Sequence, residues 1–290
     1  MAKIAATPDR DGSPPQAHPL ARGDGWSVSD VVCTLGPKSR PFEERHSSMS
    51  IAIVMAGTFQ YRSHAGREVM TPGSLLLGSA RQTFECGHEH GAGDRCISFA
   101  YTPEFCDRLG VGSSFRAMRM PRIRPLSPII AAATAAFAAG APAAWEQIAI
   151  ELAVRTAQLD RGIYNHPADA LPGAVARVSR VVRAIECDPD AAHDLTTMAL
   201  QARLSLYHFL RTFRAVTGVT PHQYLLRLRL QRAAVKLVSE SSKVLDVALE
   251  SGFGDVSNFN RAFRAEFGVN PRAWRRGTRI GRSPCLDSTP

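Results

Sequence analysis

Cysteine and histidine side chains gather in the first third of the sequence, where their spacing can hold a metal ion. Cys86, His88 and His90 alternate along the chain, so on a β-strand they would share one face. With Cys96 or His46 nearby, such ligands suit zinc or another borderline metal. Three glycines interrupt the same stretch, which favours a turn after a strand instead. Both interpretations stay open, and we assign no metal ion and no cofactor.

The six cysteines show no disulfide framework and no zinc-finger pattern. They stand at positions 33, 86, 96, 106, 187 and 285, and no CxxC pair occurs. This usage is typical of reduced thiols, which favours a cytoplasmic protein. The sequence has no apolar run of about 18 residues and no apolar N-terminal segment. We therefore expect neither a membrane partner nor a secretory signal.

A second group of chemically capable side chains is basic and lies in the C-terminal third. Residues 175–279 carry 17 Lys and Arg against 9 Asp and Glu, whereas residues 1–174 carry 17 against 16. Most of the net charge of +9 therefore lies in one segment. A basic segment beside a nearly neutral one is typical of a nucleic-acid-binding domain, although a solvated helical surface has the same composition.

This basic segment contains one pattern twice. The copies start at Ser205 and Asp255, two residue types that cap helices. From each start, Phe, Arg, Phe, Gly and Pro follow after 4, 6, 8, 13 and 16 residues. Ala199 and Ala248 precede the two starts, and a small residue there lets a second helix cross closely. A repeat of about 50 residues with matched intervals predicts two helix-turn-helix units.

Helical patterns must position these residues, and they fill the chain after residue 173. The expected helices are 174–187, 195–202, 206–217, 221–239, 244–251, 256–267 and 271–276. Asp194 can cap the second of them, and Pro221 opens the long fourth helix. That long helix would join the two units and hold their second helices at a fixed separation.

The second helix of each unit should turn one face to solvent and bury its two Phe side chains. The outer face would hold Leu206, Tyr207, Leu210, Arg211 and Arg214 in the first copy, and Val256, Ser257, Asn260, Arg261 and Arg264 in the second. Arg211 and Arg261 can read guanine edges, and Asn260 can read adenine. Arg214 and Arg264 lie one turn further and suit phosphates. For each single Arg, a solvated or ion-paired side chain is the alternative.

The C-terminal pattern resembles the AraC/XylS family of bacterial transcription regulators. The residues that carry the resemblance are Asp246-Val247-Ala248, Gly252-Phe253, Phe259, Arg261, Phe263, Phe267-Gly268 and Pro271, with Tyr224 and Arg229 in the long helix. The resemblance covers about residues 175–279 and implies activation or repression of promoters, usually by a dimer. The upstream part resembles, more loosely, the cupin-like effector and dimerisation domain of that family. Its best local match is Thr71-Pro72-Gly73 followed by three leucines.

The upstream part has short strand-like runs such as 50–55 and 96–101, separated by Gly, Pro and Ser. Their spacing predicts a small β-barrel or jelly roll. Two amphipathic helices follow within residues 126–161. The second carries an apolar face of Trp145, Ile148 and Leu152, which either contacts a second copy of the chain or packs on the barrel.

We therefore expect an α+β chain with a cupin-like β-barrel and two helices, then an all-α domain of two helix-turn-helix units. The divisions are a disordered lead-in at 1–20, an effector and dimerisation domain at 21–161, a linker at 162–173, an AraC-type DNA-binding domain at 174–279 and a disordered tail at 280–290. The resemblance implies double-stranded promoter DNA, a small-molecule effector and a second copy as partners, and leaves room for RNA polymerase. It implies no enzymatic activity and no catalytic residue.

Two other classes of protein stay open. One is a metal-dependent cupin dioxygenase fused to a DNA-binding domain, which needs three convergent ligands and an open coordination position. The sequence does not establish such a set. The other is a DNA-alkylation sensor with a zinc-bound cysteine as methyl acceptor, and the absence of paired cysteines argues against it.

Overall fold

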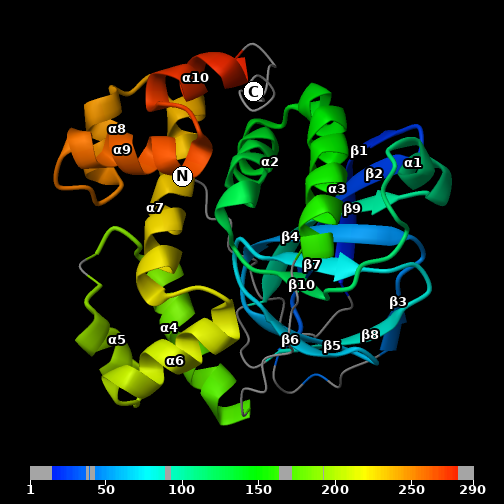
Figure 1. Cartoon of the computed structure of the whole chain (residues 1–290), viewed down its shortest axis with the longest axis horizontal. Coiled ribbons are helices and arrows are strands. Elements are labelled where there is room, and N and C mark those ends of the chain that lie inside the picture. Colours follow the sequence, from blue (N-terminus) through cyan, green and yellow to red (C-terminus); the bar gives the residue numbers. More distant parts are fainter. Residues whose placement is uncertain are drawn as a thin grey trace.

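The computed structural model describes residues 15–36, 39, 43–88, 93–162, 172–191 and 193–279, with a sheet-rich N-terminal part beside a helical C-terminal part (Figure 1). The strands are β1 (Gln16–Gly23), β2 (Trp26–Cys33), β3 (Glu43–Arg45), β4 (Met49–Ala56), β5 (Phe59–Ser63), β6 (Gly66–Met70), β7 (Leu75–Gly78), β8 (Thr83–Gly87), β9 (Asp94–Tyr101) and β10 (Arg119–Met120). The α-helices are α1 (Pro103–Arg108), α2 (Ser127–Ala139), α3 (Trp145–Gly162), α4 (Pro172–Cys187), α5 (Leu195–Gln201), α6 (Leu206–Thr217), α7 (Pro221–Ser239), α8 (Val244–Glu250), α9 (Val256–Phe267) and α10 (Pro271–Arg279). Single 3-10 turns precede α2 and α3.

The strands form two separate antiparallel sheets, ordered β1-β2-β9-β4-β7-β10 and β3-β8-β5-β6. Successive residues of β4 enter different cores, because side chains alternate across a strand. Ile51 and Ile53 face the helices, whereas Ala52 and Val54 face the second sheet. We expected a cupin-like barrel, but the strands described here pair as an open sandwich and not as a closed barrel. Strand spacing does not reveal which strands pair, so the sequence left this undecided.

Helices α2 and α3 cover the outer face of the six-stranded sheet (Figure 1). Trp145, Ile148 and Leu152 of α3 are all buried in this core, and the rings of Trp145 and Phe99 lie 6.0 Å apart. The apolar face of α3 therefore packs within its own chain. Of the two alternatives for this face, packing against the sheet is the one that the structure shows for these three residues. A dimer contact through other residues of 126–161 stays a prediction.

Strand β1 begins where we expected a disordered lead-in through residue 20. It pairs with β2 from Gln16 opposite Val32 to Gly23 opposite Trp26. Its side chains are exposed or half-buried, so backbone pairing orders the strand and apolar burial contributes little. Amino-acid composition does not reveal such backbone pairing. Residues 1–14, residues 163–171 of the expected linker and the tail 280–290 lie outside the described residues.

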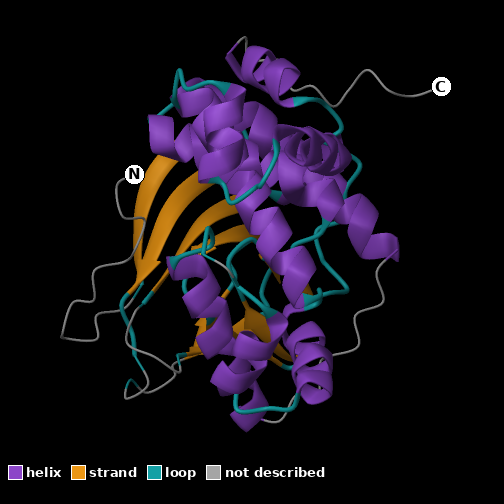
Figure 2. Cartoon of the chain, turned by 90° about the vertical axis from the view of Figure 1, so that its left-hand side faces the viewer, coloured by secondary structure: helices purple, strands orange, loops and turns teal. Residues whose placement is uncertain are grey.

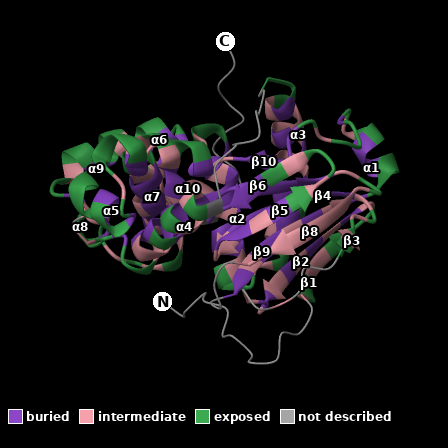
Figure 3. Cartoon of the chain, turned by 90° about the horizontal axis from the view of Figure 1, so that it is seen from below, coloured by how far each residue is buried: buried purple, intermediate pink, exposed green. Residues whose placement is uncertain are grey.

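The C-terminal helices form two small cores that share α7. Leu225 and Leu228 of α7 enter the first core, and Leu230 and Ala233 enter the second. Seen from the side of these helices, the strands lie behind them (Figure 2). In Figure 3, α7 is largely buried between the units, whereas α6 and α9 carry exposed residues on their outer sides.

Candidate nucleic-acid interface

The matched intervals of the repeat correspond to matched local structure in α6 and α9. Ser205 and Asp255 cap these helices by accepting hydrogen bonds from the backbone amides of His208 and Asn258. Both helices end at a glycine in the left-handed conformation, with φ of 80° at Gly218 and 78° at Gly268. An L-residue with a side chain is strained there, so glycine ends both helices at equivalent positions.

The Phe pairs settle which face of each helix is turned outward. The buried pairs are Phe209 and Phe213 in α6, and Phe259 and Phe263 in α9, all with no exposed surface. Of the ten expected contact residues, eight are exposed and the other two, Leu210 and Val256, are half-buried. Tyr207 is 70% exposed and Leu206 is 45% exposed. The predicted outer faces are therefore correct, while their contact with DNA stays a prediction.

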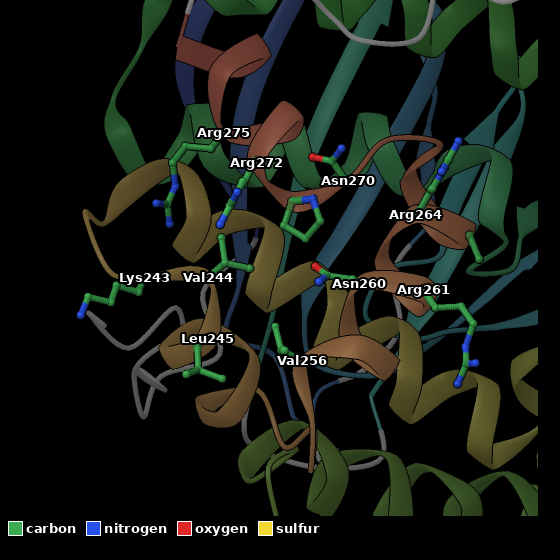
Figure 4. A pocket seen from close by; sticks show the side chains of 12 residues that line it. Lys243, Val244, Leu245, Val256, Asn260, Arg261, Arg264, Asn270, Arg272 and Arg275 are labelled. Atoms are coloured by element: carbon green, nitrogen blue, oxygen red, sulfur yellow. The ribbon is translucent and has the colours of Figure 1, made fainter.

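A basic groove runs beside α9, between α10 and the start of α8 (Figure 4). The described residues that line it include five cations and no carboxylate; the cations are Lys243, Arg261, Arg264, Arg272 and Arg275. Asn260 and Asn270 also line it. A concave surface of this charge suits a phosphate backbone, because clustered cations attract the polyanion.

Three of these cations, Lys243, Arg272 and Arg275, were not predicted from the sequence, because they lie outside the second helix of each unit. Lys243 and Arg272 are exposed. The guanidinium of Arg275 instead donates to the carbonyls of Leu237 and Ser242, at 2.9 and 2.6 Å, so it ties α10 to the end of α7. The signal in the sequence was the Arg-rich stretch after Pro271.

The two units differ at the equivalent of Arg272. In the second unit Arg272 follows the first residue of α10, and in the first unit His222 occupies the same place in α7. The second unit is therefore more basic where its third helix begins.

A family model described as a helix-turn-helix domain matches residues 198–277. Over 80 residues the chain is 42% identical to the HTH-type transcriptional activator RhaS of Escherichia coli O139:H28. This match covers 28% of this chain and 29% of RhaS. Residues 198–277 are an AraC-type helix-turn-helix domain. The chain is also 28% identical over 100 residues to the HTH-type transcriptional regulator MtrA of Neisseria gonorrhoeae, covering 34% of this chain and 33% of MtrA.

The AraC-type domain is also similar to a solved transcriptional regulator with an AraC-type DNA-binding domain from Chromobacterium violaceum. The identity is 25%, and the likeness covers 37% of this chain and 96% of that chain with a TM-score of 0.35. The chain spans about a third of the length of the curated relatives it matches. All ten expected contact residues lie within the AraC-type domain. Within the described residues, no helix is both long and apolar enough to cross a membrane.

Outside the AraC-type domain, the Cys and His cluster is arranged differently from the pattern we weighed. His88 lies 3.5 Å from the sulfur of Cys33 and 3.1 Å from the carboxylate of Asp94. Cys86 is not part of this group, and His90 lies outside the described residues. Sequence spacing missed Cys33 and Asp94 because strand pairing brings them together across 61 residues of chain.

Proposed function

We propose that this protein is a transcription regulator that binds promoter DNA through α6 and α9. The observation that carries the proposal is the pair of equivalent capped helices, each with a buried Phe pair and an exposed basic face. A capped helix with a free polar face is the element that helix-turn-helix proteins insert into the major groove.

Helix α7 supports binding by both units at once. Its 19 residues correspond to about 28 Å of rise, and its side chains enter both cores. It therefore acts as a stiff spacer between α6 and α9. A protein that reads two successive major-groove segments needs its recognition helices about 34 Å apart, which a spacer of this length suits.

We further propose that the N-terminal part binds a small-molecule effector and passes its state to the AraC-type domain. The support is a polar junction with α7. Arg122 is 3% exposed and donates to the side chain of Gln231, and Arg227 donates to the carbonyl of Arg122 at 2.6 Å. The hydroxyl of Tyr224 lies 3.3 Å from the carbonyl of Pro72. Movement of the N-terminal part would break bonds to the helix that spaces the two units.

We also propose that the protein forms a homodimer, contacts RNA polymerase and lies in the cytoplasm. We propose no enzymatic activity. The resemblance to AraC/XylS regulators supports the first three. The relatives MtrA and RhaS, which are named as transcriptional regulators, support the last.

The experiment first selects DNA sites for the full chain from a pool of random sequence. The affinity of the chain for a selected site is then measured between 50 and 200 mM salt. With about 6–10 phosphate contacts, affinity should fall about 10³–10⁵-fold over that range. An unchanged affinity across the range, or no selected sequence at all, would contradict the proposed function.

A further inference from the structure

The strand pairing of the N-terminal sandwich brings a thiol and a carboxylate together at one end. Cys33 ends β2, Asp94 begins β9, and the two residues are partners in the antiparallel register. Cys96 lies two residues beyond Asp94 and belongs to the core between the sheets. Because side chains alternate, Cys33 and Asp94 face that same inter-sheet space. The geometry of β2 and β9 therefore places both groups where the second sheet can reach them.

His88 approaches from the second sheet, directly after β8. One ring nitrogen, Nε2, lies 3.5 Å from Cys33 Sγ, and the other, Nδ1, lies 3.1 Å from Asp94 Oδ2. The three groups offer ligand atoms that all lie within 4.8 Å of one another. The side chains are enclosed, with 4% of His88 and 9% of Asp94 exposed. One face of the His88 ring packs towards Phe59, with the ring centres 6.2 Å apart.

Asp94 is the ligand group whose buried carboxylate a bound cation would stabilise. Its Oδ2 atom is buried, and within the described residues it forms an ion pair with Nδ1 of His88 at 3.1 Å. A buried carboxylate paired with a single imidazole carries a desolvation cost that a bound metal ion lowers further.

We propose that Cys33, His88 and Asp94 are the three protein ligands of a site for a borderline divalent cation, zinc or a metal of similar preference. Thiolate, imidazole and carboxylate are the ligand types that zinc takes, and three protein ligands leave a fourth position open. Corner atoms of a zinc tetrahedron with bond lengths of about 2.0–2.3 Å lie about 3.3–3.6 Å apart. The Sγ–Nε2 distance already matches. Because the metal ion would bind one ring nitrogen, the Asp94 carboxylate, which now lies beside Nδ1, would have to approach Nε2, and the three ligand atoms would close by roughly 1 Å from their present spacing of up to 4.8 Å. Binding would displace the thiol proton as the Cys33–metal bond forms.

Such a site would join the two sheets at one end of the sandwich, because two ligands come from the large sheet and one follows the small sheet. The alternative is a hydrogen-bonded clip of the same three groups that holds no ion. The two cases differ in whether the free protein takes up metal with Cys33 as a ligand.

The experiment titrates Co²⁺ alone into reduced, chelator-treated full-length protein. A thiolate ligand to Co²⁺ gives a charge-transfer absorption in the near ultraviolet, which we expect to saturate at one equivalent and to disappear when Zn²⁺ is added. The Cys33→Ser variant should lose this band. Asp94→Asn should weaken binding by at least about tenfold. The matched control is Cys187→Ser, because Cys187 is an exposed free cysteine outside the sandwich; its titration should equal that of the wild type.

A measurement on the wild type alone guards against variants that fail to fold. One equivalent of Zn²⁺ should slow alkylation of Cys33 and leave that of Cys187 unchanged, with both sites followed by peptide mass spectrometry. The proposal is overturned if the wild type shows no band, if Cys33→Ser keeps it, or if Zn²⁺ fails to protect Cys33.

Discussion

Ser127, the first residue of α2, donates a side-chain hydrogen bond to Glu266 of α9. Glu266 also lies 3.4 Å from Arg227 of α7 and 3.7 Å from Arg124. It is 6% exposed, whereas Arg264 on the same helix is exposed. The inner face of α9 is therefore bonded to the N-terminal part while its outer face is free. A shift of α2 would act directly on the helix that we propose reads DNA.

The bond between Ser127 and Glu266 should contribute measurably to the contact between the two parts. Ser127→Ala leaves a buried carboxylate with one donor fewer, so we expect a loss of about 1–3 kcal/mol in the stability of the α9 unit. Thermal unfolding of the full chain measures this loss of stability, and the DNA affinity of the same variant is measured alongside it. Ser241→Ala, an exposed position, should change stability by less than about 0.5 kcal/mol. Equal effects of the two variants would show that the bond contributes nothing.

Arg261 and Arg264 should differ in the kind of contact they make. Arg261→Ala should weaken binding to the selected site and relax preference at one base pair, because a bidentate guanine contact contributes about 1–3 kcal/mol of discrimination. Arg264→Ala should weaken all sequences about equally and lower the salt slope by about 1. The measurement is binding of both variants to the site and its single-base changes at two salt concentrations. A uniform loss for Arg261→Ala would make it a phosphate contact.

Arg272 extends the proposed interface beyond α9. Arg272→Ala should reduce affinity for all sequences and lower the salt slope by about 1, as expected for one lost phosphate contact. His222→Ala, at the equivalent position of the first unit, is the matched control and should leave the slope unchanged. If the slope is unaffected by Arg272→Ala, the basic groove lies away from the DNA backbone.

Leu152 should act through the N-terminal core and not through a dimer interface. Its side chain has no exposed surface, so Leu152→Ala should destabilise the N-terminal part by about 2–5 kcal/mol. Sedimentation should show the same oligomeric state for the wild type and for Leu152→Ala at temperatures where both are folded. Gln158→Ala, exposed on the same helix, should match the wild type in both measurements. Dissociation caused by Leu152→Ala alone would restore the face of α3 as an interface.

The sequence alone determined the helical half of this protein in detail. Caps at Ser205 and Asp255, the Phe pairs and the terminal glycines are local signals, since each acts within about one turn of a helix. The interval of two residues between Arg261 and Phe263 was enough to turn one outward and the other inward. The same local reasoning overlooked Arg272, because it treated the second helix of each unit as the whole interface.

Only the tertiary structure decided what depends on pairing between distant segments. The sandwich replaced the expected barrel because hydrogen bonding between strands is non-local, and spacing along the chain does not encode it. Burial of Leu152 against the sheet, in place of a second copy, was decided by the same packing. Cys33, His88 and Asp94 meet because β2 pairs with β9 and β8 lies in the facing sheet. The sequence suggested Cys86 and His90 as partners for His88, with Cys96 or His46 nearby. Proximity in sequence is a poor guide where antiparallel strands bring distant residues together.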